Sequence, residues 1–183
     1  MTFARAVFLG LLAMSPRTSP AQQHPDFSGT WKQDTSRTQS IGGGTGNRER
    51  AGGGRGGGLG LGPPAQELVI VQTAHTLTVT ERRDSSSAQT IYALDGKRQT
   101  NVMTSGRSSG TTAVFVTTWK NERLETKISA PPGPRGGAAT TYVETRFIDR
   151  DGSLVIETTI PGRANLRRLV YVRADSRGPA RLY

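Results

Sequence analysis

The stretch Phe27-Ser28-Gly29-Thr30-Trp31 decides how this chain is interpreted, because it opens a long series of short segments with alternating side chains. Between the Gly-rich stretch that ends at Gly62 and the loop at residues 131–137, apolar residues recur at every second position, as at Leu77 and Val79, with Thr, Ser or a charged residue between them. A period of two is the pattern of β-strands, whose successive side chains point to opposite faces. The sequence therefore predicts an all-β protein with no helix of useful length after residue 22.

The links between these segments predict how the strands are connected. Asp95-Gly96 and Asp151-Gly152 indicate two-residue hairpin turns, in which both central positions need a positive φ. Most links are of hairpin length, so we expect an antiparallel meander that closes into an up-and-down barrel of about 8–10 strands and thereby hides its edges. The predicted strands are residues 28–33, 66–73, 76–82, 88–94, 97–103, 111–119, 122–130, 140–149, 153–160 and 166–173.

The N-terminus predicts export. Arg5 is followed by an apolar run from Ala6 to Met14 and by the small residues of Ser19-Pro20-Ala21, which is the pattern of a secretory signal peptide cleaved after Ala21. The apolar run is far shorter than the roughly 20 residues that span a bilayer. We expect a secreted or periplasmic protein in which residues 1–21 are the signal peptide and residues 22–183 form a single domain. The chain has no Cys, so neither a disulfide nor a lipid on Cys stabilises or anchors it.

Two segments are predicted to be loops, and the charge is basic. Between Gly42 and Gly62, 12 of 21 positions are Gly, and the segment 42–64 is expected to be a flexible excursion because Gly brings no side chain to bury. Residues 131–137 indicate a second loop.

Without residues 1–21 the chain keeps 22 basic and 14 acidic residues, a net charge of +8, which allows weak contact with anionic surfaces but identifies no partner.

Phe27-x-Gly29-x-Trp31 resembles the signature that opens lipocalins and fatty-acid-binding proteins, the calycin group of barrels. The ending of the chain, residues 168–174, is similar to the last strand of intracellular fatty-acid-binding proteins. The resemblance implies that the first Trp plugs one end of the barrel and that a late Arg stacks on it. The residues expected to close the barrel in this way are Phe27, Gly29, Trp31 and Arg173.

Two features depart from the fatty-acid-binding family. That family places an Arg two residues before the Tyr of its last strand to hold a carboxylate, whereas Leu169 stands two residues before Tyr171. We therefore expect a neutral apolar ligand to be preferred over a fatty acid, since a buried carboxylate without a cation loses solvation. The family also carries a helical lid between its first two strands, where this chain has the Gly-rich excursion.

Five aromatic residues are candidates for the lumen, where they would bind a small apolar or aromatic ligand. They are Tyr92, Phe115, Trp119, Tyr142 and Tyr171. The same residues could instead fill a small barrel completely, and the sequence leaves both alternatives open.

Other chemistry finds little support. His24 lies in the lead before the first strand and His75 in a predicted turn, so no metal site is expected, and no cofactor motif is present. No Gly-x-Ser-x-Gly elbow occurs. Four glutamates on predicted strands are expected on the outer face, namely Glu81, Glu125, Glu144 and Glu157. The single Arg55-Gly56-Gly57 unit is too little to predict binding of nucleic acid.

Two functions remain. The first is an exported, non-enzymatic binding protein that holds a small hydrophobic ligand in its lumen and acts as a monomer. The second is a filled barrel that serves as an envelope or surface interaction module without a small-molecule ligand. A hydrolase or isomerase on the same barrel has no set of residues to support it.

Overall fold

The computed structural model describes residues 24–40, 63–84, 86–103, 110–132, 139–161 and 167–174, and these residues form strands without helices. The ten predicted strands are all present, with ends that shift by up to two residues. The strands are β1 Gly29–Gln33, β2 Gln39–Ser40, β3 Glu67–Gln72, β4 Thr76–Arg83, β5 Ser86–Ala93, β6 Arg98–Val102, β7 Thr112–Lys120, β8 Arg123–Ala130, β9 Thr140–Ile148, β10 Leu154–Thr159 and β11 Arg167–Arg173.

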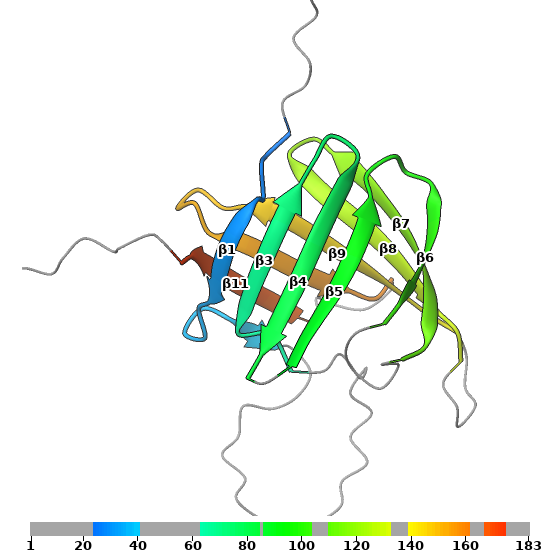
Figure 1. Cartoon of the computed structure of the whole chain (residues 1–183), viewed down its shortest axis with the longest axis horizontal. Helices are drawn as coiled ribbons and strands as arrows, with labels where there is room; N and C mark the ends of the chain where they lie inside the picture. The colour runs from blue at the N-terminus through cyan, green and yellow to red at the C-terminus, as the bar shows by residue number, and fades with distance from the viewer. Residues whose placement is uncertain are drawn as a thin grey trace, which may run out of the picture.

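The strands form one antiparallel sheet that curls into a barrel (Figure 1). Their order is β5-β4-β3-β1-β11-β10-β9-β8-β7-β6, so the last strand lies beside the first, and each strand in this order is hydrogen-bonded to the next. The predicted up-and-down barrel is thus confirmed, with one difference. In the described part of the chain no backbone ladder joins β5 to β6, so the barrel is nearly closed rather than closed.

The antiparallel order gives the barrel two distinct ends. The N-terminal lead and the short turns at residues 73–75, 94–97, 121–122 and 149–153 lie at one end, which we call the closed end. Residues 63–66, which lead into β3, and the C-terminal end of β6 lie at the other end, which we call the open end. The predicted signal peptide lies outside the described residues, as does the Gly-rich segment apart from Pro63 and Pro64.

The hairpin turns differ in detail from the prediction. Gly96 and Gly152 have φ values of 74° and 80°, but the Asp before each glycine is not among the residues with a positive φ. Instead, Asp95 Oδ1 accepts a hydrogen bond from the Lys97 backbone N–H at 3.0 Å, and Asp151 Oδ1 accepts one from Ser153 at 2.9 Å. The carboxylates stabilise these turns by a local Asx contact, so a turn with two positive φ values is not needed.

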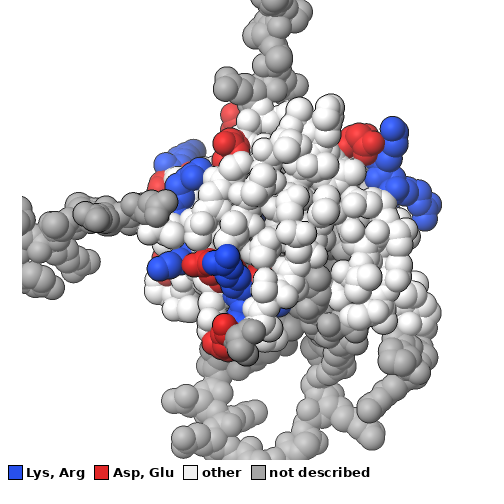
Figure 2. All heavy atoms as spheres, in the orientation of Figure 1, with Lys and Arg blue, Asp and Glu red and all other residues white. Residues whose placement is uncertain are grey.

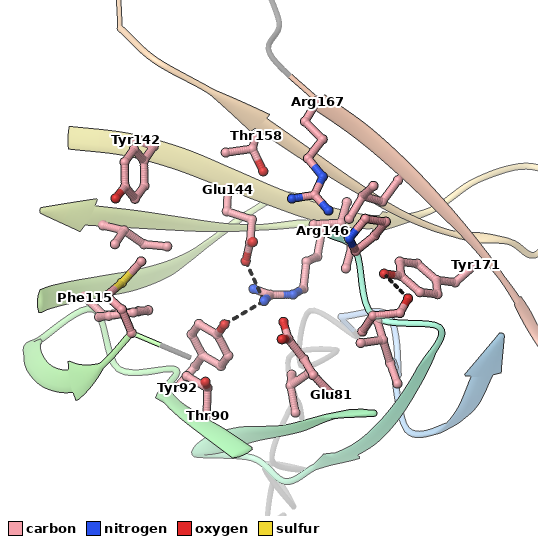
Figure 3. A pocket seen from close by; sticks show the side chains of 18 of the residues that line it. Glu81, Thr90, Tyr92, Phe115, Tyr142, Glu144, Arg146, Thr158, Arg167 and Tyr171 are labelled. Atoms are coloured by element: carbon pink, nitrogen blue, oxygen red, sulfur yellow. Dashed lines mark hydrogen bonds and ion pairs between the residues drawn. The ribbon is translucent and has the colours of Figure 1, made fainter. Parts of the chain in front are cut away.

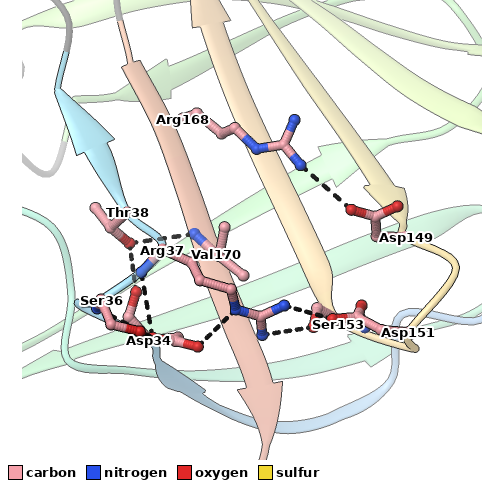
Figure 4. A network of polar contacts seen from close by, with 9 residues as sticks. All are labelled: Asp34, Ser36, Arg37, Thr38, Asp149, Asp151, Ser153, Arg168 and Val170. Atoms are coloured by element: carbon pink, nitrogen blue, oxygen red, sulfur yellow. Dashed lines mark hydrogen bonds and ion pairs between the residues drawn. The ribbon is translucent and has the colours of Figure 1, made fainter.

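One strand, β2, was not predicted; it follows the turn at residues 34–38 and pairs with β11. In this turn Asp34 accepts hydrogen bonds from Ser36 and Arg37, and Arg37 reaches Asp151 and the Ser153 hydroxyl from across β11 (Figure 4). A two-residue strand has no alternation to detect, because its place is set by contacts with residues more than one hundred positions away.

Apolar residues pack on both faces of the sheet near β9 to β11. The main core lies inside the barrel, where Trp31, Leu77, Leu124 and Leu154 are fully buried. A smaller group lies outside, where Val155 is opposite both Phe147 and Val170. These three are buried, with the Arg123 guanidinium 4.0 Å from the centre of the Phe147 ring. The Arg123 guanidinium, which also lies 4.0 Å from Glu157, thus covers part of the outer apolar surface.

The charged side chains visible in Figure 2 lie mainly at the margins of that face, where Lys and Arg are next to Asp and Glu. The centre of this face, over β3, β4 and β5, is largely uncharged. No described residue belongs to a helix long and apolar enough to cross a membrane.

Candidate functional site

A cavity of about 90 Å³ lies inside the barrel toward the open end. One part of its wall is apolar, with Leu68, Val79, Phe115, Ile128, Ile156 and Leu169 among its residues. Another part carries five charged side chains, namely Arg83 and the four labelled in Figure 3, Glu81, Glu144, Arg146 and Arg167. The lumen is therefore neither filled completely nor purely apolar.

Strand alternation places these charges inside. On β4 the buried Leu77 and Val79 are followed at the same period by Glu81, and on β9 the buried Tyr142 is followed by Glu144 and Arg146. The expectation that Glu81 and Glu144 lie on the outer face was wrong. On both strands every second side chain points inward, and this alternation includes the charged residues, which form ion pairs inside the barrel.

The other two strand carboxylates do lie away from the cavity. Glu125 forms an ion pair with Lys120 at 2.7 Å, and Glu157 forms one with Arg168 at 2.9 Å. Each alternates with inward neighbours, such as Leu124 beside Glu125. Outward charge on these strands follows the ordinary rule that charged residues face solvent.

Arg146 is the central polar residue of the cavity. Its side chain is only 3% exposed, it forms an ion pair with Glu144, and its Nη2 donates a hydrogen bond to the Tyr92 hydroxyl at 2.8 Å. Its Nε and Nη1 are buried without a hydrogen-bond partner. Unmade hydrogen bonds of a buried charged group are costly, so these two nitrogens are the strongest indication of a ligand position in the cavity.

Burial and charge act together on the titration of these groups. Burial raises the pKa of Tyr92 well above its usual value, so this hydroxyl stays protonated. Burial by itself lowers the pKa of Arg146, but the charge of Glu144 and the contact with Tyr92 outweigh burial and leave the pKa above its usual value. The guanidinium therefore stays charged and can donate hydrogen bonds to an anion.

The last strand brings a second arginine to the cavity. Arg167, Leu169 and Tyr171 alternate on the inner face of β11 and all line the cavity. Burial lowers the pKa of Arg167 and raises that of Tyr171, whose hydroxyl donates a hydrogen bond to the Ala65 carbonyl at 3.1 Å. Leu169 thus lies in the lumen. The expected preference for neutral ligands assumed that the lumen holds no cation, and this assumption was wrong.

The predicted aromatic residues divide into two groups. Tyr92, Phe115, Tyr142 and Tyr171 line the cavity, and the rings of Tyr92 and Phe115 meet edge to face at 5.8 Å between centroids. Trp119 does not, which corrects that part of the prediction. Its position in the alternation of β7 points its side chain inward, but it lies at the closed end beside Phe27. The position of a residue along the barrel axis depends on the stagger of the strands, which alternation does not reveal.

His24 covers one side of Trp119 at that end. The two rings are stacked in parallel with their centroids 4.2 Å apart, and His24 Nδ1 lies 3.3 Å from the Asn121 carbonyl oxygen. The N-terminal lead is therefore attached to the barrel end at His24, which the sequence did not predict. The hollow beside these rings, which Asp26, Gln72 and Leu94 also line, is an open surface depression.

The residues predicted to close the barrel meet at the same end. The Trp31 indole Nε1–H donates a hydrogen bond to the Phe27 carbonyl at 2.9 Å, and the Arg173 guanidinium lies 4.5 Å from the centre of the Trp31 ring. Gly29 has a φ of 133°, and Arg173 Nη1 donates a hydrogen bond to the Ser28 carbonyl at 3.0 Å. These contacts join the first strand to the last through one buried ring.

Within the described segments, no group of three or more His, Cys, Asp or Glu is placed to hold a metal ion. His75 lies exposed in the turn between β3 and β4. What the arrangement offers chemically is a set of hydrogen-bond donors, buried and positively charged, next to an apolar wall.

Comparison with known proteins identifies the fold. No protein-family model matches the sequence, and no curated protein matches it. Among solved structures, the chain is similar to the "REP1-NXSQ fatty acid transporter", with a TM-score of 0.55, 10% identity, and coverage of 81% of this chain and 96% of that one. It is also similar to human cRBP IV, with a TM-score of 0.54, 17% identity, and coverage of 82% and 99%. The chain therefore has the calycin-like barrel fold of these proteins.

Proposed function

We propose that the protein is a non-enzymatic binding protein whose lumen holds a small amphipathic ligand with an anionic head group. The observation that carries this proposal is Arg146, which is charged, 97% buried and lines the cavity with Nε and Nη1 unpartnered. A carboxylate there would accept the hydrogen bonds that these nitrogens do not make within the protein.

The balance of charge in the cavity supports an anion. Three arginines and two glutamates line it, which leaves one net positive charge in a site partly shielded from solvent by the barrel wall. Charge interactions are stronger in such a site than in water, so an anion is favoured over a neutral or cationic ligand of the same shape. Phe115 and Ile128 offer an apolar wall for the tail of the ligand.

The volume limits the size of the ligand. Ligand pockets commonly measure about 300–1,000 Å³, whereas this cavity has about 90 Å³. A head group and a few carbon atoms fit without movement of the walls. One of the similar structures is described as a fatty acid transporter, which agrees with the ligand class proposed here.

The same small volume favours a second candidate function, a barrel filled by its own side chains that acts as an interaction module. The two candidate functions differ in whether an amphipathic anion binds inside the barrel.

For either function we propose export through cleavage after Ala21, supported by the apolar run and small residues of the leader.

Calorimetric titration with hexanoate and hexanol tests the proposal. Hydrogen bonds to charged groups contribute about 1.5–3 kcal/mol, so hexanoate should bind at least about tenfold more tightly than hexanol. Arg146→Met should remove this preference, whereas Arg168→Met, which removes an arginine from an outer ion pair, should keep it. Because Arg146→Met leaves Glu144 without its partner, Arg146→Lys is the second variant, and it should keep the charge preference at reduced affinity.

Equal affinity for hexanol and hexanoate would overturn the anionic head group. If neither compound binds, the filled barrel is the better description.

A further inference from the structure

The seam between β5 and β6 differs from every other strand contact of the barrel. Each neighbouring pair in the strand order is joined by backbone hydrogen bonds, but in the described residues β5 and β6 are joined through side chains. Gln99 Oε1 accepts a hydrogen bond from the Ala93 backbone N–H at 2.7 Å, and Asn101 Nδ2 donates one to the Ile91 carbonyl at 2.9 Å. Two side-chain amides thus stand where a ladder of peptide groups would otherwise close the barrel.

These amides also interact with each other, since Gln99 Nε2 donates to Asn101 Oδ1 at 3.4 Å. Both face inward, because they are opposite the buried Phe115 and Ala113 on β7. Side chains have rotatable bonds that peptide groups in a ladder lack. The seam can therefore open by rotation of two side chains, whereas any other pair of strands would have to break a backbone ladder.

The cavity reaches the outer surface beside this seam. Val102 lies opposite Thr112, on the outer face of β6, and is 56% exposed. It nevertheless lines the same cavity as Thr90 and Tyr92 of β5. Val102 is the last residue of β6, so the cavity reaches the outer face where the seam meets the open end of the barrel.

The edge strand on the other side of the seam has an unusual composition. Ser86–Ala93 has no charged residue and no Pro, whereas every other strand of more than two residues contains at least one charged residue. Exposed strand edges are ordinarily protected by charges. The β5 edge therefore presents no charge that would hinder the passage of an apolar tail.

From these observations we infer that ligand enters the lumen sideways between β5 and β6, and that Gln99 and Asn101 form a latch whose opening admits ligands larger than the resting cavity. The inference rests on the proposed function. It explains how a lumen of about 90 Å³ could accept a longer ligand, since separation of the two strands adds volume without loss of a backbone ladder.

Cross-linking tests the inference with a bulky probe. Because the chain has no Cys, Ile91→Cys and Thr100→Cys place a single pair of thiols across the seam for a short bifunctional thiol reagent. Thr80→Cys and Gln89→Cys, which are opposite each other in the β4–β5 ladder, form the matched control. The bulky probe is 8-anilinonaphthalene-1-sulfonate, its position in the lumen is checked by competition with hexanoate, and its association is followed by stopped-flow fluorescence.

Cross-linking at the seam should slow association of the bulky probe by about tenfold or more, with little change in the control. The Gln99→Ala and Asn101→Ala double variant should bind it about tenfold faster, because both hydrogen bonds of the latch are lost. Equal rates in the two cross-linked proteins would overturn entrance through the seam while leaving lumen binding intact.

A measurement without ligand separates failure of the latch from failure of the proposed function. Hydrogen exchange of the Ala93 amide should be at least about tenfold faster in Gln99→Ala, and unchanged exchange would overturn the latch even if ligands bind. If the wild-type protein binds neither hexanoate nor the bulky probe, the proposed function fails and the inferred route falls with it.

Discussion

Replacement of Gly29 by Ala should disrupt the closed end of the barrel in two separable ways. Gly29 has a φ of 133°, a conformation that residues with a Cβ rarely adopt. A Cβ at this position would also lie 2.8 Å from Arg173 Nη1 and 3.9 Å from Trp31 Nε1. The guanidinium is the far end of a flexible side chain, so it can move away, but it then loses its hydrogen bond to Ser28 and its place over the Trp31 ring.

The cost follows from these two parts. Backbone strain of this kind costs about 1–3 kcal/mol. Loss of the exposed cation–π contact, with one hydrogen bond, adds about 1 kcal/mol. Gly29→Ala should therefore destabilise the protein by about 2–4 kcal/mol, which corresponds to a fall in melting temperature of about 5–15 °C for a chain of this length.

Thermal and urea unfolding of four proteins measure these parts: the wild type, Gly29→Ala, Arg173→Ala and the double variant. Gly29→Ala should cost less in the Arg173→Ala background, where only strain remains. Gly152→Ala is the matched control, because Gly152 has a φ of 80° and nothing lies within 4 Å of its would-be Cβ. The reasoning is refuted if Gly29→Ala is neutral, or if it costs the same with and without Arg173.

Three further variants probe other parts of the barrel. Trp31→Ala should cost about 3–5 kcal/mol in urea unfolding, since the ring is fully buried. Thr117→Val should destabilise by about 1–3 kcal/mol by leaving the Thr126 hydroxyl, 3.0 Å away, without its partner, while the double Val variant should be nearly neutral. Hydrogen bonds from Ser153, with the Arg37 guanidinium, lower the pKa of Asp151 to about 2. The ionised Asp151 side chain therefore stabilises the folded state above about pH 4, and this stabilisation is lost as the pH falls toward 2. The difference in melting temperature between the wild type and Asp151→Asn should shrink over that interval.

Most of the fold could be predicted because strands and turns leave local patterns in the sequence. Alternation located ten strands, and glycines located the turns, as at Gly96 and Gly152. The contacts at the closed end follow from the order of the strands, since a closed meander puts the last strand beside the first. For this reason the sequence alone predicts that Arg173 lies near Trp31.

The charged lumen was missed although the alternation contained it. Counting by two from Val79 leads to Glu81, and counting from Tyr142 leads to Glu144 and Arg146. The prediction followed the general rule that charged residues face solvent, but in these strands the two-residue alternation places the charged side chains inside. Inside the barrel, Arg146 is stabilised by its ion pair with Glu144 and by the Tyr92 hydroxyl, which comes from a strand 54 positions away in the sequence.

Two other features needed the three-dimensional structure. The position of Trp119 along the barrel axis depends on the stagger between strands, which alternation does not reveal. The amides of Gln99 and Asn101 are ordinary polar residues in the sequence, and their contacts with β5 become visible only once the two strands lie side by side.

A crystal structure of the protein with bound hexanoate tests the central claim most directly. The account predicts a carboxylate inside the barrel, within hydrogen-bond distance of Arg146 Nε or Nη1, with its tail along Phe115 and Ile128. Hexanoate bound only outside the barrel, or a lumen closed by its own side chains at saturating hexanoate, would contradict it.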